Sequence, residues 1–128
     1  MTVARAHVLL VEDELPLLQL LEKYLRRMEF EVSTHSSSVQ ALKEFEANPA
    51  RYDLVIADLG MPDISGDAML AKMLEIRPDV LILICSGSPY YLSTLPKDLE
   101  RRVGFLQKPF LPKMLLEEIE KLMAKKQS

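Results

Sequence analysis

The run Val80-Leu81-Ile82-Leu83-Ile84-Cys85 is the most apolar stretch of the chain, and Ser86-Gly87 closes it. The run is short and rich in β-branched residues, which favours a strand over a helix. A strand that is apolar at every position is buried on both faces, as in a parallel sheet that helices cover on each side. The run therefore predicts a buried strand of a parallel sheet.

Short apolar runs of this kind recur along the chain and alternate with segments of helical periodicity. The predicted strands cover residues 7–11, 30–34, 54–57, 80–85 and 103–106. The first, second, third and last predicted helices cover residues 18–28, 37–48, 68–76 and 111–122. Ser37 followed by Gln40 is typical of a helix start. This alternation predicts an α/β fold, a doubly wound (βα)5 domain with a parallel sheet.

The segment between the fourth and fifth strands, residues 88–100, is poor helix material. In a helix interior, Pro96 would lose a backbone hydrogen bond and clash with the preceding turn, at about 3 kcal/mol. We therefore expect the fourth helix of the pattern to be short, broken or displaced, and more mobile than the other four.

Composition excludes several classes of protein. The chain has 128 residues, 48% of them hydrophobic, which predicts a single domain over 1–128 with a core from about 6 to 124. The net charge of −3 gives no broad basic surface for nucleic acid. Cys85 is the lone cysteine, and strand alternation would point it away from Ser86 into the core. No apolar run could span a bilayer and no export signal is recognisable, so we expect a cytoplasmic domain.

Polar side chains follow four of the five predicted strands. Glu12 and Asp13 come after the first strand, Asp58 after the third, Ser86 after the fourth and Lys108 after the fifth. Because ligands bind at the carboxyl ends of the strands in such sheets, we expect these side chains to converge. Three carboxylates about 4 Å apart would repel by roughly 4 kcal/mol per pair at an effective dielectric of about 20. Mg²⁺ or the lysine would offset that charge.

Each of these residues, taken singly, could also have a purely structural role. Acidic residues such as Glu12 and Asp13 favour the start of a helix. Asp58 could cap a loop, Ser86 could belong to a turn, and Lys108 could be a solvated charge. Four polar strand ends with complementary charge are harder to obtain in this way, and together they favour a site for Mg²⁺ and a phosphate group.

Four ordered motifs extend over nearly the whole chain. They are Val8-Leu9-Leu10-Val11-Glu12-Asp13-Glu14, Asp53-Leu54-Val55-Ile56-Ala57-Asp58, Met61-Pro62-Asp63-Ile64-Ser65-Gly66 and Phe105-Leu106-Gln107-Lys108-Pro109-Phe110. Each motif is modestly specific, but the ordered set resembles the response regulator receiver domains of two-component signalling. The resemblance implies a flavodoxin-like sheet with the strand order 2-1-3-4-5.

Position by position, the resemblance implies that Asp58 is the phosphoacceptor and also a Mg²⁺ ligand. It further implies that Asp13 is a direct metal ligand, that Glu12 acts through a water molecule, and that Gly60 contributes its backbone carbonyl. Glu12 replaces the aspartate that is commoner at its position, a substitution that the family tolerates.

The resemblance also assigns a catalytic lysine and a pair of switch residues. Lys108 matches the lysine that pairs with the phosphoryl group, and the Lys108-Pro109 bond is expected to be cis. Ser86 stands at the position of the switch hydroxyl and Phe105 at that of the switch aromatic. Phe105 lacks the hydroxyl of the tyrosine often found there. Phosphorylation is expected to change the surface around the fourth helix, the fifth strand and the fifth helix.

The implied function is a phosphoacceptor receiver domain of a two-component phosphorelay. Its partner would be the phosphohistidine of a histidine kinase or of a phosphotransfer domain, and its output partner is open. Such a domain catalyses its own phosphorylation but turns over no independent substrate, so we do not expect an enzyme. We expect no direct nucleic-acid binding and no membrane insertion. The sequence leaves open a stand-alone regulator or the receiver of a hybrid histidine kinase.

Three other kinds of protein share part of this pattern. A pseudo-receiver, an interaction module that never takes phosphate, is disfavoured because Asp58 and Lys108 are both present. An FMN carrier shares the topology but needs a phosphate-binding loop where the acidic residues 12–14 stand. A haloacid-dehalogenase-type phosphatase also uses an aspartyl nucleophile. It needs a second aspartate two residues further on, where Gly60 stands.

Overall fold

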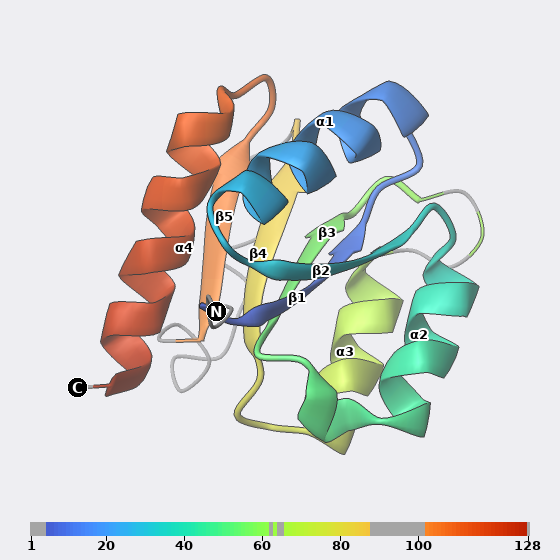
Figure 1. The fold of residues 1–128 in the computed structure, drawn as a ribbon. Coiled ribbons are helices and arrows are strands. Elements are labelled where there is room, and N and C mark those ends of the chain that lie inside the picture. The colour runs from blue at the N-terminus through green and yellow to red at the C-terminus, as the bar shows by residue number, and fades with distance from the viewer. Residues whose placement is uncertain (1–4, 62, 64–65, 88–101, 128) are drawn as a thin grey trace.

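A parallel β-sheet forms the centre of the molecule (Figure 1). The computed structural model describes residues 5–61, 63, 66–87 and 102–127, and within them five strands lie in the order β2-β1-β3-β4-β5. The strands are β1 (His7–Val11), β2 (Glu31–His35), β3 (Leu54–Asp58), β4 (Leu81–Ser86) and β5 (Val103–Gln107). The helices are α1 (Leu15–Arg27), α2 (Ser38–Ala47), the 3-10 helix η1 (Pro49–Arg51), α3 (Gly66–Ile76) and α4 (Pro112–Gln127). The order confirms the predicted doubly wound fold.

Helices cover both faces of the sheet. α1 and α4 pack on one face, and α2 and α3 pack on the other (Figure 1). Along β1, Val8 and Leu10 belong to the core under α1 and α4, whereas Leu9 and Val11 belong to the core under α2 and α3. Every residue of β4 is buried, which explains why this strand is apolar at consecutive positions rather than at alternate ones.

The predicted strands agree with the observed ones to within one residue at each end. The first helix begins at Leu15, earlier than its apolar periodicity indicates, and Pro16 lies in its first turn, where a missing N–H costs no helical hydrogen bond. The last helix continues to Gln127, beyond its apolar stripe. The predicted fourth helix, with Pro96, falls at residues 88–100, which lie outside the described residues.

Gly104 on β5 lets α4 lie close to the sheet. A Cβ atom at this position would lie 3.1 Å from Leu122 Cδ1 and 3.2 Å from Leu83 Cδ1, closer than side chains normally approach. The helix and the strand therefore pack tightly.

Candidate functional site

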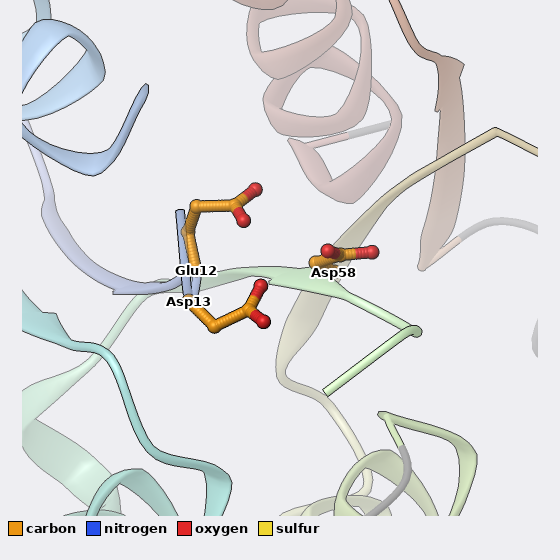
Figure 2. A group of neighbouring side chains, drawn as sticks. All are labelled: Glu12, Asp13 and Asp58. Atoms are coloured by element: carbon orange, nitrogen blue, oxygen red, sulfur yellow. The ribbon is translucent and has the colours of Figure 1, made fainter. Parts of the chain in front are cut away.

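The carboxyl edge of the sheet brings three acidic side chains together. Glu12 and Asp13 follow β1, and Asp58 is the last residue of β3, the strand that pairs with β1. One carboxylate oxygen from each lies within 4.8 Å of the others. Figure 2 shows the carboxylates of Glu12 and Asp13 turned toward Asp58. The predicted convergence of these three strand-end residues is therefore observed.

Lys108, which follows β5, supplies the positive charge of this cluster. Its Nζ donates to Glu12 Oε1 at 2.8 Å and to Asp58 Oδ2 at 3.2 Å. Glu14 Oε1 lies further away, at 3.8 Å. The Glu12 side chain is 3% exposed and that of Asp58 is 13% exposed, so solvent screens these contacts only weakly. One ammonium group thus bridges two acids from different strands.

Burial and charge act against each other on the ionisable groups of the cluster. Burial raises the pKa of Glu12, and the hydrogen bond and charge of Lys108 offset part of that rise. For Lys108, burial acts to lower the pKa, but the hydrogen bonds and charges of Glu12 and Asp58 outweigh it, and the pKa of the ammonium group is raised. Lys108 is therefore a cation at neutral pH.

The backbone around the cluster is held by hydrogen bonds between neighbouring strand ends. Gly60 N donates to Asp58 Oδ1 at 3.1 Å, which orients the carboxylate from its own loop. Glu12 N donates to the carbonyl of His35 at the end of β2, at 3.1 Å, and Lys108 N donates to the carbonyl of Ser86 at 2.8 Å. These bonds link the end of β1 to that of β2 and the end of β5 to that of β4, and they orient Asp58 at the end of β3.

The two predicted switch residues lie at different distances from the acids along the sheet. Ser86 is buried at the end of β4, one residue beyond Cys85, which pairs with Asp58. Phe105 pairs with Ile84 further back in the sheet and is partly buried against the core under α2 and α3. Ser86 therefore belongs to the same edge as the acids, and Phe105 lies behind it. The Lys108-Pro109 bond is cis, as the resemblance implied.

Cys85 is a core residue, as strand alternation predicted. It is buried in the cluster under α1 and α4, and burial raises the pKa of its thiol to about 12. At neutral pH the thiol is protonated, so it is a poor nucleophile.

Sequence reasoning missed Asp63 as a structural residue. Its carboxylate, in the loop after β3, accepts hydrogen bonds from the start of α2, which lies 24 to 26 residues away in the chain. The local signal at that helix pointed to Ser37, whose Oγ does accept from Gln40 N at 3.3 Å. Nothing near Asp63 in the sequence indicates the second cap.

A membrane-spanning helix is absent from the part of the chain that the structure describes, because none of its helices is both long and apolar enough.

The fold and the site define a class of protein: a doubly wound α/β domain with clustered carboxylates and a lysine at the carboxyl edge of its sheet. A sequence model described as the response regulator receiver domain matches residues 8–120. The chain therefore belongs to the response regulator receiver domain family of two-component signalling.

Individual relatives agree with this assignment. The chain is 31% identical over 122 residues to the sensor kinase CckA of Brucella abortus, where the match covers 94% of this chain but only 13% of the kinase. It is 28% identical over 116 residues to the response regulator receiver protein CpdR of the same organism, covering 91% of this chain and 95% of that protein. A receiver domain structure from Clostridium thermocellum superimposes with a TM-score of 0.81 at 29% identity, over 95% of this chain and 97% of that one.

Proposed function

We propose that this domain accepts a phosphoryl group on Asp58 from the phosphohistidine of a histidine kinase or phosphotransfer domain. The observation that carries the proposal is the contact of Lys108 Nζ with Asp58 Oδ2 at 3.2 Å, beside the carboxylates of Glu12 and Asp13. A carboxylate nucleophile beside a fixed cation suits phosphoryl transfer, because that reaction needs positioning and charge neutralisation more than covalent help.

The proposed transfer balances without a further reactant. A carboxylate oxygen of Asp58 forms a bond to phosphorus while the phosphorus–nitrogen bond of the phosphohistidine breaks, and the imidazole leaves with the bonding electrons. Lys108 faces the negative charge of the transferred group, and the hydroxyl of Ser86 at the same edge supplies a hydrogen bond to it. The product is an acyl phosphate on the domain itself, so the domain turns over no independent substrate.

The donor set fits a Mg²⁺ ion. Glu12, Asp13 and Asp58 offer hard carboxylate oxygens within 4.8 Å of one another, the ligand type that this ion takes. Asp13 and Asp58, with the Gly60 carbonyl, would hold the ion. Both oxygens of Glu12 already accept hydrogen bonds, from Lys108 Nζ and Glu14 N, which favours its action through water. When bound, Mg²⁺ neutralises charge on the carboxylates and on the incoming phosphoryl oxygens.

The same proposal extends to the conformational change that phosphorylation would cause and to the kind of protein that contains this domain. Ser86 would move toward the phosphoryl group, with Phe105 turning inward behind it, and the surface beside β5 and the last helix would change. The similarity to a segment of a sensor kinase, to the receiver domain of a hybrid histidine kinase and to a receiver protein of almost the same length supports either a hybrid-kinase or a stand-alone context. The reduced, buried Cys85 suits the cytoplasm.

Acetyl phosphate with Mg²⁺ tests the phosphoacceptor directly. Intact-mass measurement should show one added phosphoryl group on the wild type and none on Asp58→Asn. Asp79→Asn, at the exposed end of the loop before β4, is the matched control and should label like the wild type. A wild type that stays unlabelled while a known receiver labels in the same buffer would favour the pseudo-receiver instead.

The metal part of the proposal has its own test. Mg²⁺ should raise the melting temperature of the wild type, because the unfolded chain has no such site. Asp13→Asn removes one charged ligand, so its melting temperature should respond much less to the same Mg²⁺ series. Equal responses in the two proteins would show that Asp13 is not a ligand.

A further inference from the structure

Asp63 ties the loop after β3 to the first residues of α2. Its Oδ2 accepts from Ser37 Oγ at 2.6 Å and from Val39 N at 3.0 Å, and its Oδ1 accepts from Ser38 N at 3.2 Å. An aspartate at this place satisfies amide groups that a helix start otherwise leaves without a helical partner. Here the capping carboxylate comes from another loop, so the cap is also a tertiary contact.

Both ends of that contact lead directly to the acidic cluster. On one side, Asp63 lies five residues after Asp58 in the chain, in the loop whose Gly60 N donates to Asp58 Oδ1. On the other side, α2 follows β2 closely, and the carbonyl of His35 at the end of β2 accepts from Glu12 N at 3.1 Å. The contact therefore closes a ring that joins the end of β3 to the end of β1.

Two residues of the loop that follows Asp58 are held by apolar packing. Leu59 and Met61 are 7% and 6% exposed, and both pack into the core under α2 and α3. Ser38, whose amide donates to Asp63, is fully buried. Apolar burial thus holds Leu59 and Met61 near Asp58, and hydrogen bonds to α2 hold Asp63.

We propose that Asp63 is a positioning residue of the acidic site, a brace that sets the spacing between Asp13 on the β1 side and Asp58 with Gly60 on the β3 side. This inference rests on the proposed function, because it assigns Asp63 to the Mg²⁺ site of that function. Asp63 touches neither the ion nor the phosphoryl group. Its effect is on how well the ligands are placed before the ion binds.

A brace and a simple helix cap make different predictions. A simple cap stabilises α2, so its loss lowers the melting temperature and leaves the Mg²⁺ affinity of the folded protein unchanged. If Asp63 is a brace, its loss also lowers the affinity of the folded protein for Mg²⁺. Lys43→Gly is the matched control, because Lys43 is exposed in the middle of α2, and glycine weakens the helix there without touching the loop.

The experiment measures the dissociation constant for Mg²⁺ alone by following backbone amide resonances in the full chain. Asp63→Ala should raise that constant about three- to tenfold, since removing support around metal ligands commonly has effects of this size or larger. Lys43→Gly should lower the melting temperature similarly and leave the constant unchanged. In acetyl phosphate labelling, Asp63→Ala should need more Mg²⁺ for half-maximal rate while approaching the wild-type rate at saturating Mg²⁺.

Asp63→Asn separates the brace from the charge. Asparagine keeps an oxygen that can accept from an α2 amide, so this variant should bind Mg²⁺ more like the wild type than like Asp63→Ala. An Asp63→Asn protein as weak as Asp63→Ala would assign the effect to lost charge and overturn the brace. Unchanged affinity in Asp63→Ala would overturn it too, while leaving the phosphoacceptor proposal intact. A wild type that binds no Mg²⁺ would overturn both the brace and the metal site.

Discussion

Among the residues that the structure describes, two groups of polar side chains beside the sheet are built in opposite ways. The first is the acidic cluster of Glu12, Asp13, Asp58 and Lys108 at the carboxyl edge of the sheet. The second, which we call the α2-side network, consists of His7, Ser33, Tyr52 and Glu44 and lies on the sheet face that α2 covers.

In the α2-side network, each polar atom meets a complementary one. His7 Nε2 and Ser33 Oγ are 2.8 Å apart, and Tyr52 OH donates to Glu44 Oε2 at 2.9 Å. The His7 and Tyr52 rings meet edge to face, with centroids 4.9 Å apart. Burial lowers the pKa of His7 and raises that of Tyr52, so both are neutral at pH 7. Such a network adds to stability without leaving net charge inside.

The acidic cluster instead gathers like charges around the Lys108 ammonium group. Its carboxylates repel one another, and burial raises the pKa of Glu12. This arrangement contributes less to stability than the same area of complementary contacts, but it leaves a site that a divalent cation can complete. The difference supports the proposal that the acidic cluster serves the phosphoryl-transfer chemistry and that the α2-side network serves the fold.

The largest expected effect comes from removing Lys108, the cation that contacts Glu12 and Asp58. Lys108→Met leaves Glu12 and Asp58 facing each other without compensation. It should lower the free energy of unfolding by about 2–4 kcal/mol, somewhat less than in a fully buried pair because Lys108 is 18% exposed. Urea unfolding without Mg²⁺ measures this loss, and added Mg²⁺ should restore part of it.

The control for that loss is Lys121→Met, which breaks the exposed contact between Lys121 Nζ and Glu118 Oε1 at 3.2 Å. Because exposed pairs contribute little, the change should stay below about 0.5 kcal/mol. Equal losses of unfolding free energy in the two variants would mean that Lys108 stabilises the acidic cluster no more than Lys121 stabilises its exposed pair.

A smaller effect is expected in the α2-side network. Tyr52→Phe removes the hydroxyl that donates to Glu44 but keeps the buried ring, and should cost about 1 kcal/mol in urea unfolding. Mg²⁺ should not restore this loss, in contrast to Lys108→Met. A Mg²⁺-dependent rescue of Tyr52→Phe would show that the two polar regions are coupled.

The smallest expected effect is on how the free energy of unfolding changes with pH. The acidic cluster and the α2-side network should contribute slopes of opposite sign. The pKa of Glu12 is raised above its ordinary 4.5, so the folded protein binds the proton of this carboxyl more tightly than the unfolded chain does. The contribution of Glu12 to the free energy of unfolding therefore falls as pH rises above 4.5. The pKa of His7 is lowered below 6.5 by burial, so its contribution falls as pH drops through 6.5.

Variants isolate the two contributions. Glu12→Gln should remove the loss of stability that begins above pH 4.5, and His7→Asn should remove the loss that begins below pH 6.5. Unfolding free energies at several pH values, compared with the wild type, measure both slopes. For each variant, the difference in unfolding free energy from the wild type is plotted against pH. Slopes of the same sign for Glu12→Gln and His7→Asn would contradict the contrast between the two regions.

Local patterns predicted the inner strands β1, β3 and β4 because burial on both faces leaves a direct mark in sequence. Consecutive apolar residues such as those of β4 are not expected in a half-exposed strand or on a surface helix, and the observed bounds agree within one residue. The meeting of Glu12, Asp13, Asp58 and Lys108 was also predictable, since parallel strands bring their carboxyl ends to one edge. The start of α1 and the end of α4 were less predictable, because the buried apolar residues that mark each helix do not extend into those turns.

The sequence by itself therefore determined the α/β class, the parallel sheet and the set of polar side chains at the carboxyl edge of that sheet. Only the tertiary structure decided that Lys108 pairs with Glu12 across 96 residues, that Asp63 caps α2, and that Gly104 admits close packing of α4. The physical reason is the sequence separation of the residues that interact. Burial and helix period are imposed on neighbouring residues of one element, whereas these contacts depend on the distance between elements, which is fixed only when the whole sheet and its helices have packed.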